Sequence, residues 1–273
     1  MSKANVSVER LAAPERHRFL SPHYDDIALS CGGTAALLAR SGRLPEVELI
    51  FGDHPDPAQP LTDFAASMHR GWGLDAAQVI AGRRAEEAAA GAILGTRAVF
   101  LPFRDAIYRG ARYLSDDDLF GTVSADEAGL PDEIVAGLGI DGDDPATTRL
   151  YAPLAIGRHV DHQQAFAAGV KLARNGRDVW YYEDLPYALN EGATEDRIAE
   201  VGMALEIAAV VDVASVWEEK IAAIMAYPSQ LATIFAYVDA GSSREEIDAV
   251  LRAYATRLGG GIPAERFWRL APS

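Results

Sequence analysis

The chain has 273 residues, 49% of them hydrophobic and 24% charged, which are proportions of a folded globular protein and not of a disordered chain. Its formal net charge of −15 repels nucleic-acid phosphate and anionic lipid, so we expect neither nucleic acid nor a membrane as a partner. The single cysteine, Cys31, excludes an intrachain disulfide bond, and the N-terminal stretch has no apolar run typical of a signal peptide. We therefore expect a cytoplasmic protein, and the sequence leaves its oligomeric state open.

The first half of the chain alternates short apolar runs with Ala-rich stretches. Strands are predicted at residues 17–20, 47–51 and 98–101, where apolar runs are bounded by turn-forming residues. Helices are predicted at residues 34–40, after Gly32-Gly33, and at residues 81–94, where Gly95 is a stop signal. Residues 52–60 are rich in Asp and Pro and are predicted to form a loop.

The second half begins with a polar segment at residues 111–144. A short helix is expected near residues 131–138, and the Asp run at 116–118 is interpreted as a solvated loop or a helix cap. Further strands are predicted at 150–154, 179–182 and 208–213, and helices at 162–174, 216–226, 229–240 and 244–257. This alternation predicts an α/β fold with a largely parallel sheet. No linker is evident, so we expect residues 1–273 to form one domain with a helical C-terminal portion.

A first cluster of chemically active side chains follows the first predicted strand, in the run Pro22-His23-Tyr24-Asp25-Asp26. Ligands bind at the carboxyl ends of strands in α/β sheets, and one imidazole with two carboxylates can supply metal ligands and a base. The alternative is that the Asp residues only cap the next helix.

A second cluster, His159-Val160-Asp161-His162, follows the predicted strand at 150–154. Two histidines three positions apart face the same way in a first helical turn, although such pairs also occur on plain surfaces. Three His or carboxylate ligands with an open fourth position are what a catalytic zinc ion requires. Because both clusters follow predicted strands in the same chain, together they predict a metal-dependent hydrolase.

These residues resemble the signature of a known family. The run at residues 21–26, with Ser30-Cys31-Gly32-Gly33, resembles the PHPDD motif of the PIG-L, or LmbE-like, deacetylases, and residues 157–162 look like their HxDH motif. Supporting matches are at residues 83–86, 94–95, 101–105 and 181–187, and at Lys220 with residues 227–230. The resemblance implies a Rossmann-like, mostly parallel sheet with helices on both faces. It also implies a zinc-dependent deacetylase of N-acetylated sugars.

The resemblance further implies roles for individual residues. His23, Asp26 and His162 would bind one zinc ion per chain, although iron(II) also suits such a ligand set. Asp25 would be the general base that takes a proton from water. His159 would stabilise the oxyanion and protonate the leaving amine, with Asp161 orienting it and keeping it charged.

Three further positions are candidate substrate contacts. Arg83 matches an Arg that contacts substrate in some members, and otherwise would pair with Glu86 or Glu87 on a solvated helix. Asp105 lies at a strand end, where it could bind sugar hydroxyls or cap a loop. Tyr24 replaces the proline usual in the family motif and is interpreted either as inert packing or as part of the sugar site.

The predicted substrate is an N-acetylglucosaminyl conjugate. The motif variant and chain length look most like the pseudoaglycone deacetylases of teicoplanin-type glycopeptide biosynthesis, so a small-molecule glycoconjugate is the expected partner. The alternatives are an inositol-type or thiol-precursor N-acetylglucosamine conjugate, hydrolysis of another bond such as a peptide or phosphoester, or a non-catalytic, metal-containing glycan-binding protein. A large aglycone would need an open, partly apolar mouth, which the segments 52–70 and 106–144 could build.

Overall fold

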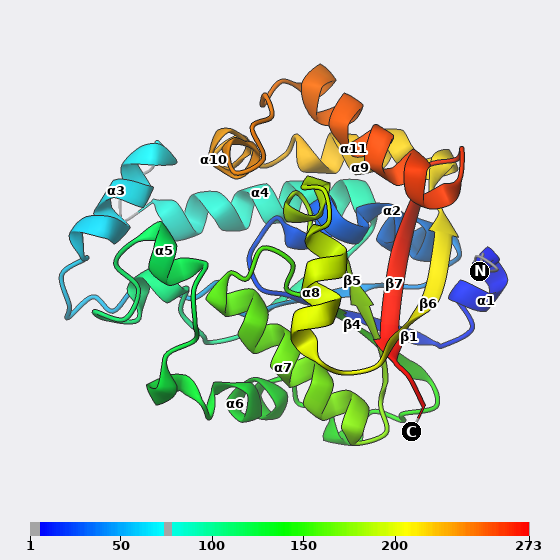
Figure 1. Cartoon of the computed structure of the whole chain (residues 1–273), viewed down its shortest axis with the longest axis horizontal. Coiled ribbons are helices and arrows are strands. Elements are labelled where there is room, and N and C mark those ends of the chain that lie inside the picture. Colours follow the sequence, from blue (N-terminus) through cyan, green and yellow to red (C-terminus); the bar gives the residue numbers. More distant parts are fainter. Residues whose placement is uncertain (1–5, 74–77, 273) are drawn as a thin grey trace.

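Seven strands form one sheet in the order β3-β2-β1-β4-β5-β7-β6 (Figure 1). The computed structural model describes residues 6–73 and 78–272. The strands are β1 (Arg16–Ser21), β2 (Glu46–Leu49), β3 (Arg97–Phe100), β4 (Thr148–Pro153), β5 (Asp178–Tyr182), β6 (Leu205–Asp212) and β7 (Ala264–Leu270). The six predicted strands are β1 to β6, whereas β7 was not predicted.

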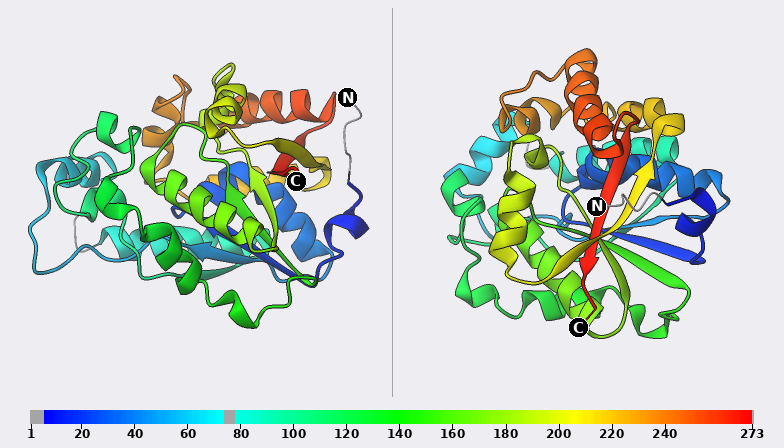
Figure 2. Two further views of the ribbon diagram at one scale, coloured as in Figure 1. Left: turned by 60° about the horizontal axis from the view of Figure 1, so that its bottom comes forward. Right: turned by 45° about the vertical axis from the view of Figure 1, so that its right-hand side comes forward.

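The sheet is parallel from β3 through β5, which confirms the predicted α/β class. β7 runs antiparallel to both β5 and β6, and Figure 2 shows β7 beside β6 at one edge. The order 3-2-1-4-5 is that of a Rossmann-like, doubly wound sheet, in which the winding reverses between β1 and β4. The chain segments that follow β1 and β4 therefore diverge and leave a crevice at the carboxyl edge of the sheet.

Helices cover both faces of the sheet, as expected. On one face α2 (Asp26–Arg40), α4 (Val79–Leu94) and α9 (Trp217–Ile224) pack on one another, and on the other face α7 (Val160–Arg174) packs on β4 and β5 and against α6 (Leu130–Gly137) (Figure 1). The predicted stop signal of α4 is confirmed, because Gly95 caps the helix in the left-handed conformation at φ +73°.

The C-terminal portion is helical, as predicted, and ends in the unpredicted strand β7. The helices there are α8 (Ala193–Val201), α9, α10 (Leu231–Ala236) and α11 (Arg244–Gly259). Elsewhere in the chain, the remaining helices are α1 (Val8–Leu11), α3 (Asp63–Gly71) and α5 (Asp116–Leu119). The helices α3 and α8 were not predicted. Within residues 6–73 and 78–272, no helix combines the length and the apolar character needed to cross a membrane.

Helix α2 begins earlier than predicted, because Gly32-Gly33 lies inside it and not before it. The helix starts at Asp26 and has a kink at Cys31, whose φ and ψ are −142° and 25°. Past the kink, the Glu265 carboxylate of β7 accepts hydrogen bonds from the backbone N–H groups of Gly33 and Thr34 at 3.0 and 2.7 Å. A side chain at Gly33 would meet Val213 at 2.7 Å. Glycine at position 33 therefore leaves room for Glu265 of β7 to bind the backbone of α2, the helix that follows His23.

One buried histidine makes the stability of this fold depend on pH. His17 in β1 is 1% exposed, with Nδ1 at 3.1 Å from the Tyr151 hydroxyl and Nε2 at 3.0 Å from the Pro14 carbonyl oxygen. Burial, with a contribution from Arg149, lowers the pKa of this imidazole to about 4. An unfolded histidine has a pKa of about 6.5, so the unfolded chain binds more protons between these values, and acidification through this window destabilises the fold.

We expect the His17→Gln variant to lose less stability on acidification than the wild type. Between pH 7 and about pH 4.5, the wild type should lose about 2 kcal/mol more than the variant, because only the wild type must leave His17 uncharged on folding. Urea unfolding of both metal-free proteins at the two pH values measures this difference. Parallel losses in the two proteins would show that His17 does not titrate in this way.

Candidate active site

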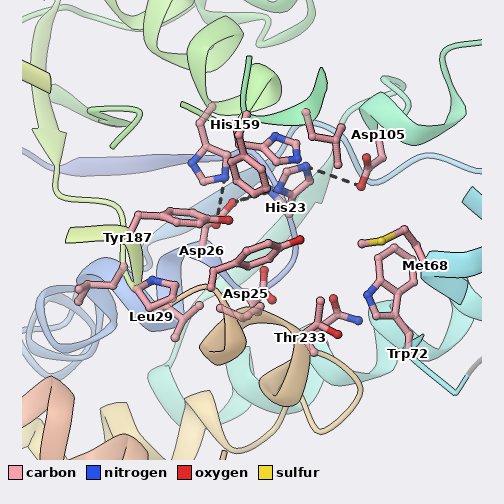
Figure 3. Close-up of a pocket in the computed structure, with 18 of the residues that line it drawn as sticks. His23, Asp25, Asp26, Leu29, Met68, Trp72, Asp105, His159, Tyr187 and Thr233 are labelled. Carbon is pink, nitrogen blue, oxygen red and sulfur yellow. Dashed lines mark hydrogen bonds and ion pairs between the residues drawn. The ribbon is translucent and has the colours of Figure 1, made fainter. Parts of the chain in front are cut away.

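The two predicted motifs meet at the carboxyl edge of the sheet, beyond the neighbouring strands β1 and β4. The loop after β1 carries His23, while His159 and His162 lie at the beginning of α7. The centroids of the three imidazole rings lie 4.8, 5.4 and 5.5 Å apart, and Figure 3 shows His23 and His159 at one side of a pocket. The sheet order therefore brings residues from distant parts of the sequence into one cluster.

Asp26 lies beside two of these rings. Its Oδ1 is 3.4 Å from Nε2 of His162, and its Oδ2 is 3.8 Å from Nδ1 of His23. One ligand atom from each of His23, His159 and His162 also lies within 4.8 Å of the other two. Imidazole nitrogen and carboxylate oxygen are ligands that suit zinc or iron(II), so this donor set fits a metal ion. The three predicted ligands lie together, and His159 lies next to them.

Asp184 orients one of these histidines. It follows β5, and its Oδ1 lies 2.7 Å from Nδ1 of His162, which leaves Nε2 of that ring on the side of Asp26. Its Oδ2 accepts the N–H of Ile156, in a turn where Ala155, Gly157 and Arg158 all have positive φ. A carboxylate on the far nitrogen of a ligand histidine fixes its ring and tautomer. Sequence reasoning assigned Asp184 no role, although it follows the strand adjacent to β4.

Asp25 immediately precedes α2, but its side chain does not cap the helix. The residue is the N-cap, but its side chain makes no capping hydrogen bond, so the helix-cap alternative does not describe it. The carboxylate is buried, Oδ2 has no hydrogen-bond partner among the described residues, and Oδ1 lies 3.8 Å from Arg83 Nη2. Burial raises the pKa of this carboxyl, and Arg83 and His23 only partly offset the effect. The arrangement leaves one buried carboxylate oxygen free to accept a proton.

Asp161 contacts its neighbours differently from the expectation. Its carboxylate lies 3.0 Å from Nε2 of His23, whereas only its backbone N–H reaches His159, at Nδ1, over 3.2 Å. Burial, His23 and His162 lower the pKa of His159 well below its usual value, although Asp161 opposes this. The Asp161 carboxylate is thus directed at His23, and an N–H donor, not this carboxylate, faces Nδ1 of His159.

A second group of possible metal ligands shares His23 and adds Asp105 and Asp161. The Asp161 carboxylate already has partners, since Arg109 donates to Oδ1 at 2.6 Å and the Ala106 N–H donates to Oδ2 at 3.0 Å. Burial opposes ionisation of Asp161, but Arg109 and His23 hold the pKa of its carboxyl well below the usual value. A divalent cation there would face the Arg109 guanidinium. The geometry thus favours a site at the three histidines, next to Asp26.

Arg83 and Asp105 both line the pocket, where substrate contacts were expected. Arg83 is buried on α4 and its guanidinium lies 4.8 Å from the Tyr24 ring centroid and 5.2 Å from that of Trp72, so it is not a solvated helix residue. Asp105 accepts the Ile107 N–H at Oδ1, and its Oδ2 lies 3.7 Å from Nε2 of His23. Asp105 therefore caps a turn and faces the cluster with its other oxygen.

Tyr24 is not positioned to contact a substrate in the pocket. Its side chain is 2% exposed, and its hydroxyl donates to the Gly52 carbonyl oxygen at 2.6 Å. The ring instead supports the Arg83 guanidinium from behind. The candidate contact is corrected to buried packing, because the hydroxyl is already bonded and the ring lies outside the lining of the pocket.

The pocket has a charged floor and an uncharged wall. By the floor we mean the ionisable residues that line the pocket, namely the three histidines with Asp25, Asp26, Arg83 and Asp105. By the wall we mean the uncharged ones, which include Met68, Trp72, Tyr187 and Thr233 (Figure 3), together with Leu119, Phe120, Ile234 and Tyr237. The empty space of the pocket, the open mouth included, is about 630 Å³. Segments 52–70 and 106–144 do contribute wall residues. The contribution of α10 was not foreseen, because its apolar residues look like core residues in the sequence.

Comparisons with known proteins agree with these observations. No family model matches the chain. The 2′-N-acetylparomamine deacetylase of Streptomyces fradiae is 31% identical over 94% of this chain and 91% of its own length, and that of Niallia circulans is 32% identical over 62% and 66%. The crystal structure of the zinc inhibited form of teicoplanin deacetylase Orf2 is similar with a TM-score of 0.76 and 26% identity, covering 94% of this chain and 98% of that one.

All three relatives are named as deacetylases, and the match to the Streptomyces fradiae protein spans 94% of this chain. The fold, the paired motifs at the edge of β1 and β4, and the sequence identity over nine tenths of a relative point to the same group. The chain belongs to the family of PIG-L, or LmbE-like, deacetylases.

Proposed function

We propose that this chain is a metal-dependent N-deacetylase that hydrolyses the acetamide of an N-acetylglucosaminyl conjugate and releases acetate and a free amino sugar. The observation that carries the proposal is the buried carboxylate oxygen of Asp25, which has no hydrogen-bond partner within residues 6–73 and 78–272 and lies beside the cluster of His23, Asp26 and His162. A base next to a metal site, but not needed to hold the ion, is what amide hydrolysis by water requires.

His23, Asp26 and His162 would hold the ion, which we propose to be one zinc. When bound, the ion supplies a Lewis acid that polarises the acetamide carbonyl and acidifies water. Asp184 supports this set from behind by fixing the His162 ring. The relative with a structure of a zinc inhibited form is a protein that zinc binds, which supports a metal site of this kind.

Asp25 takes a proton from the attacking water, and its raised pKa suits a group that must hold that proton for part of the cycle. His159 lines the pocket and accepts a backbone N–H at Nδ1, so its neutral ring carries the proton on Nε2 and can donate a hydrogen bond to the oxyanion. A neutral imidazole has no spare proton to release. We therefore assign the proton for the leaving amine to Asp25, which returns the one it received.

The wall of the pocket supports a substrate with an apolar portion. Phe120 lies with its ring centroid 5.0 Å from that of Tyr237 and 5.7 Å from that of Tyr187, and these three residues form what we call the aromatic collar. The collar offers flat aromatic surface on which the aglycone of a glycopeptide would stack. We therefore propose a teicoplanin-type conjugate, as in glycopeptide antibiotic tailoring.

Mass spectrometry of candidate conjugates after incubation with the metal-loaded protein tests the proposal through loss of an acetyl mass. The set should include an N-acetylglucosaminyl glycopeptide pseudoaglycone, 2′-N-acetylparomamine and an N-acetylglucosaminyl inositol. Faster turnover of the pseudoaglycone would support the proposed substrate. Preference for acetylparomamine would replace it with the substrate named for the sequence relatives. Tight binding of all three without turnover of any would favour a non-catalytic glycan-binding protein.

We expect the Tyr237→Ala variant to bind the preferred conjugate less tightly while its chemistry proceeds normally. Loss of one aromatic contact of about 0.5–1.5 kcal/mol corresponds to a roughly two- to tenfold rise in KM. The kcat should stay close to that of the wild type, because Tyr237 touches the other collar rings and not the floor.

The Tyr237→Phe variant is the matched control, since it keeps the ring and loses only the hydroxyl that lies 3.2 Å from Asp116. Its KM should equal that of the wild type. An unchanged KM in Tyr237→Ala, or a fall in kcat alone, would show that the collar does not hold the substrate.

A further inference from the structure

The best-connected carboxylate at the site belongs to Asp161, which is completely buried. Its Oδ2 contacts Nε2 of His23 and the N–H of Ala106, each at 3.0 Å, and its Oδ1 accepts a hydrogen bond from Arg109 Nη1 at 2.6 Å. A buried carboxylate is stable only when such partners satisfy it. Its position therefore depends on Arg109 as much as on its own helix.

Arg109 is itself held on several sides. Glu127 accepts from its Nε at 2.8 Å and from its Nη2 at 3.2 Å, and the carbonyl oxygen of Arg104 accepts from its Nη1 at 2.9 Å. Glu127 is buried and also accepts the hydroxyl of Tyr113 at 2.7 Å. Two parallel N–H to carboxylate bonds fix the plane of a guanidinium, so Arg109 presents Nη1 to Asp161 in one orientation.

The geometry points to Arg109 as a positioning residue that sets the His23 imidazole through Asp161, with Glu127 holding Arg109 in place. This inference rests on the proposed role of His23 as a metal ligand. With Nε2 of His23 engaged by Asp161, Nδ1 remains on the side of Asp26, at 3.8 Å from its Oδ2. Partners on the far nitrogen of a ligand histidine pre-orient the ring and raise its affinity for the ion.

The same inference gives a function to the segment between β3 and β4, which the sequence did not explain. This segment supplies Arg109 and Glu127 to the metal side of the site, and Leu119 and Phe120 to the wall of the pocket. Arg109 anchors this segment and also aligns His23 through Asp161, so the position of the segment and the orientation of His23 depend on the same ion pair.

Metal affinity of purified variants tests the inference without any substrate. Metal-free protein is titrated with zinc in competition with a chromophoric chelator, and the unfolding temperature of each metal-free variant is recorded. Arg109→Met should bind zinc about 10- to 100-fold more weakly than the wild type. Arg109→Lys should recover only part of the loss, because lysine restores a cation next to Asp161 but not the plane that Glu127 fixes. Glu127→Gln should show a smaller loss than Arg109→Met.

Arg112→Met is the matched control. Arg112 comes from the same segment and lies 3.9 Å from Glu127, but its guanidinium is more exposed than that of Arg109 and, among the described residues, does not contact Asp161. This variant should bind zinc like the wild type.

Zinc affinity in folded Arg109→Met equal to that of the wild type would overturn the inference. If Arg109→Met fails to fold, the other two variants decide. Wild-type zinc affinity in Glu127→Gln, together with lowered affinity in Arg109→Lys, would overturn the role of Glu127. Wild-type zinc affinity in both variants would overturn the whole inference. These outcomes differ from failure of the proposed function. A wild type that binds zinc through an Arg109-dependent site but releases no acetate would refute the deacetylase and leave the positioning role intact.

Discussion

The Asp25→Asn variant is expected to lose about 10²- to 10⁴-fold in kcat while it still binds the metal ion. Asparagine has the same shape as aspartate but cannot take a proton from water. The Asp25 carboxylate is buried, has one oxygen without a partner among the described residues, and does not cap its helix. Its removal should therefore cost chemistry and little structure. Acetate release under saturating substrate measures kcat, and metal content of the purified variant is measured in parallel.

The Asp26→Asn variant supplies the contrast. Asp26 lies next to both His23 and His162, so this change should lower metal affinity, and added metal should restore part of the activity. Added metal should not rescue Asp25→Asn. If Asp25→Asn turns over at the wild-type rate, or if it loses the ion as Asp26→Asn does, Asp25 is not the base.

The local elements of this fold could be predicted because their signals are local. Short apolar runs with turn residues on both sides gave β1 to β6, and Gly95 marked the end of α4. The order of the strands could not be read from such runs, because periodicity says which face of a strand is buried and nothing about its neighbours. The meeting of the two motifs followed from strand ends and from the resemblance to a family, and the adjacency of β1 and β4 supplied its structural cause.

The errors arose where contacts are long-range. Strand β7 has the sequence AERFWRL, in which charged and aromatic residues mix, and it becomes a strand because β5 and β6 pair with it. Tyr24 was a candidate substrate contact, but the carbonyl of Gly52 binds its hydroxyl inside the core. Only the folded chain places Asp184 behind His162, since the two residues belong to different motifs.

The contacts of His159 show the same limit. The short sequence distance to Asp161 suggested a carboxylate facing the imidazole, which would raise its pKa. In the structure the carboxylate turns to Arg109 and His23, and its backbone N–H faces the ring instead. Sequence proximity indicates that two residues are near, but the helix start decides which of their atoms meet.

Removal of the metal ion by a chelator is expected to abolish deacetylation, and one equivalent of zinc per chain is expected to restore it. The ion would bind at His23, Asp26 and His162, and its binding should raise the unfolding temperature because it binds the folded state alone. Asp184→Asn should weaken zinc binding about 10- to 100-fold, because the His162 ring loses its orienting carboxylate. Titration of the metal-free protein while activity is followed measures the stoichiometry, and parallel titration with iron(II) under anaerobic conditions compares the two metals.

The stoichiometry decides between chemistries, because hydrolysis of phosphoesters commonly uses two metal ions. The second group of ligands shares His23 with the first, and Arg109 neutralises its Asp161 carboxylate. A second ion would have to take a nitrogen of a ring already committed to the first site and to displace a guanidinium bonded at 2.6 Å. One equivalent is therefore expected. Activity that rises until two equivalents are bound would contradict the single-ion deacetylase and favour hydrolysis of another bond.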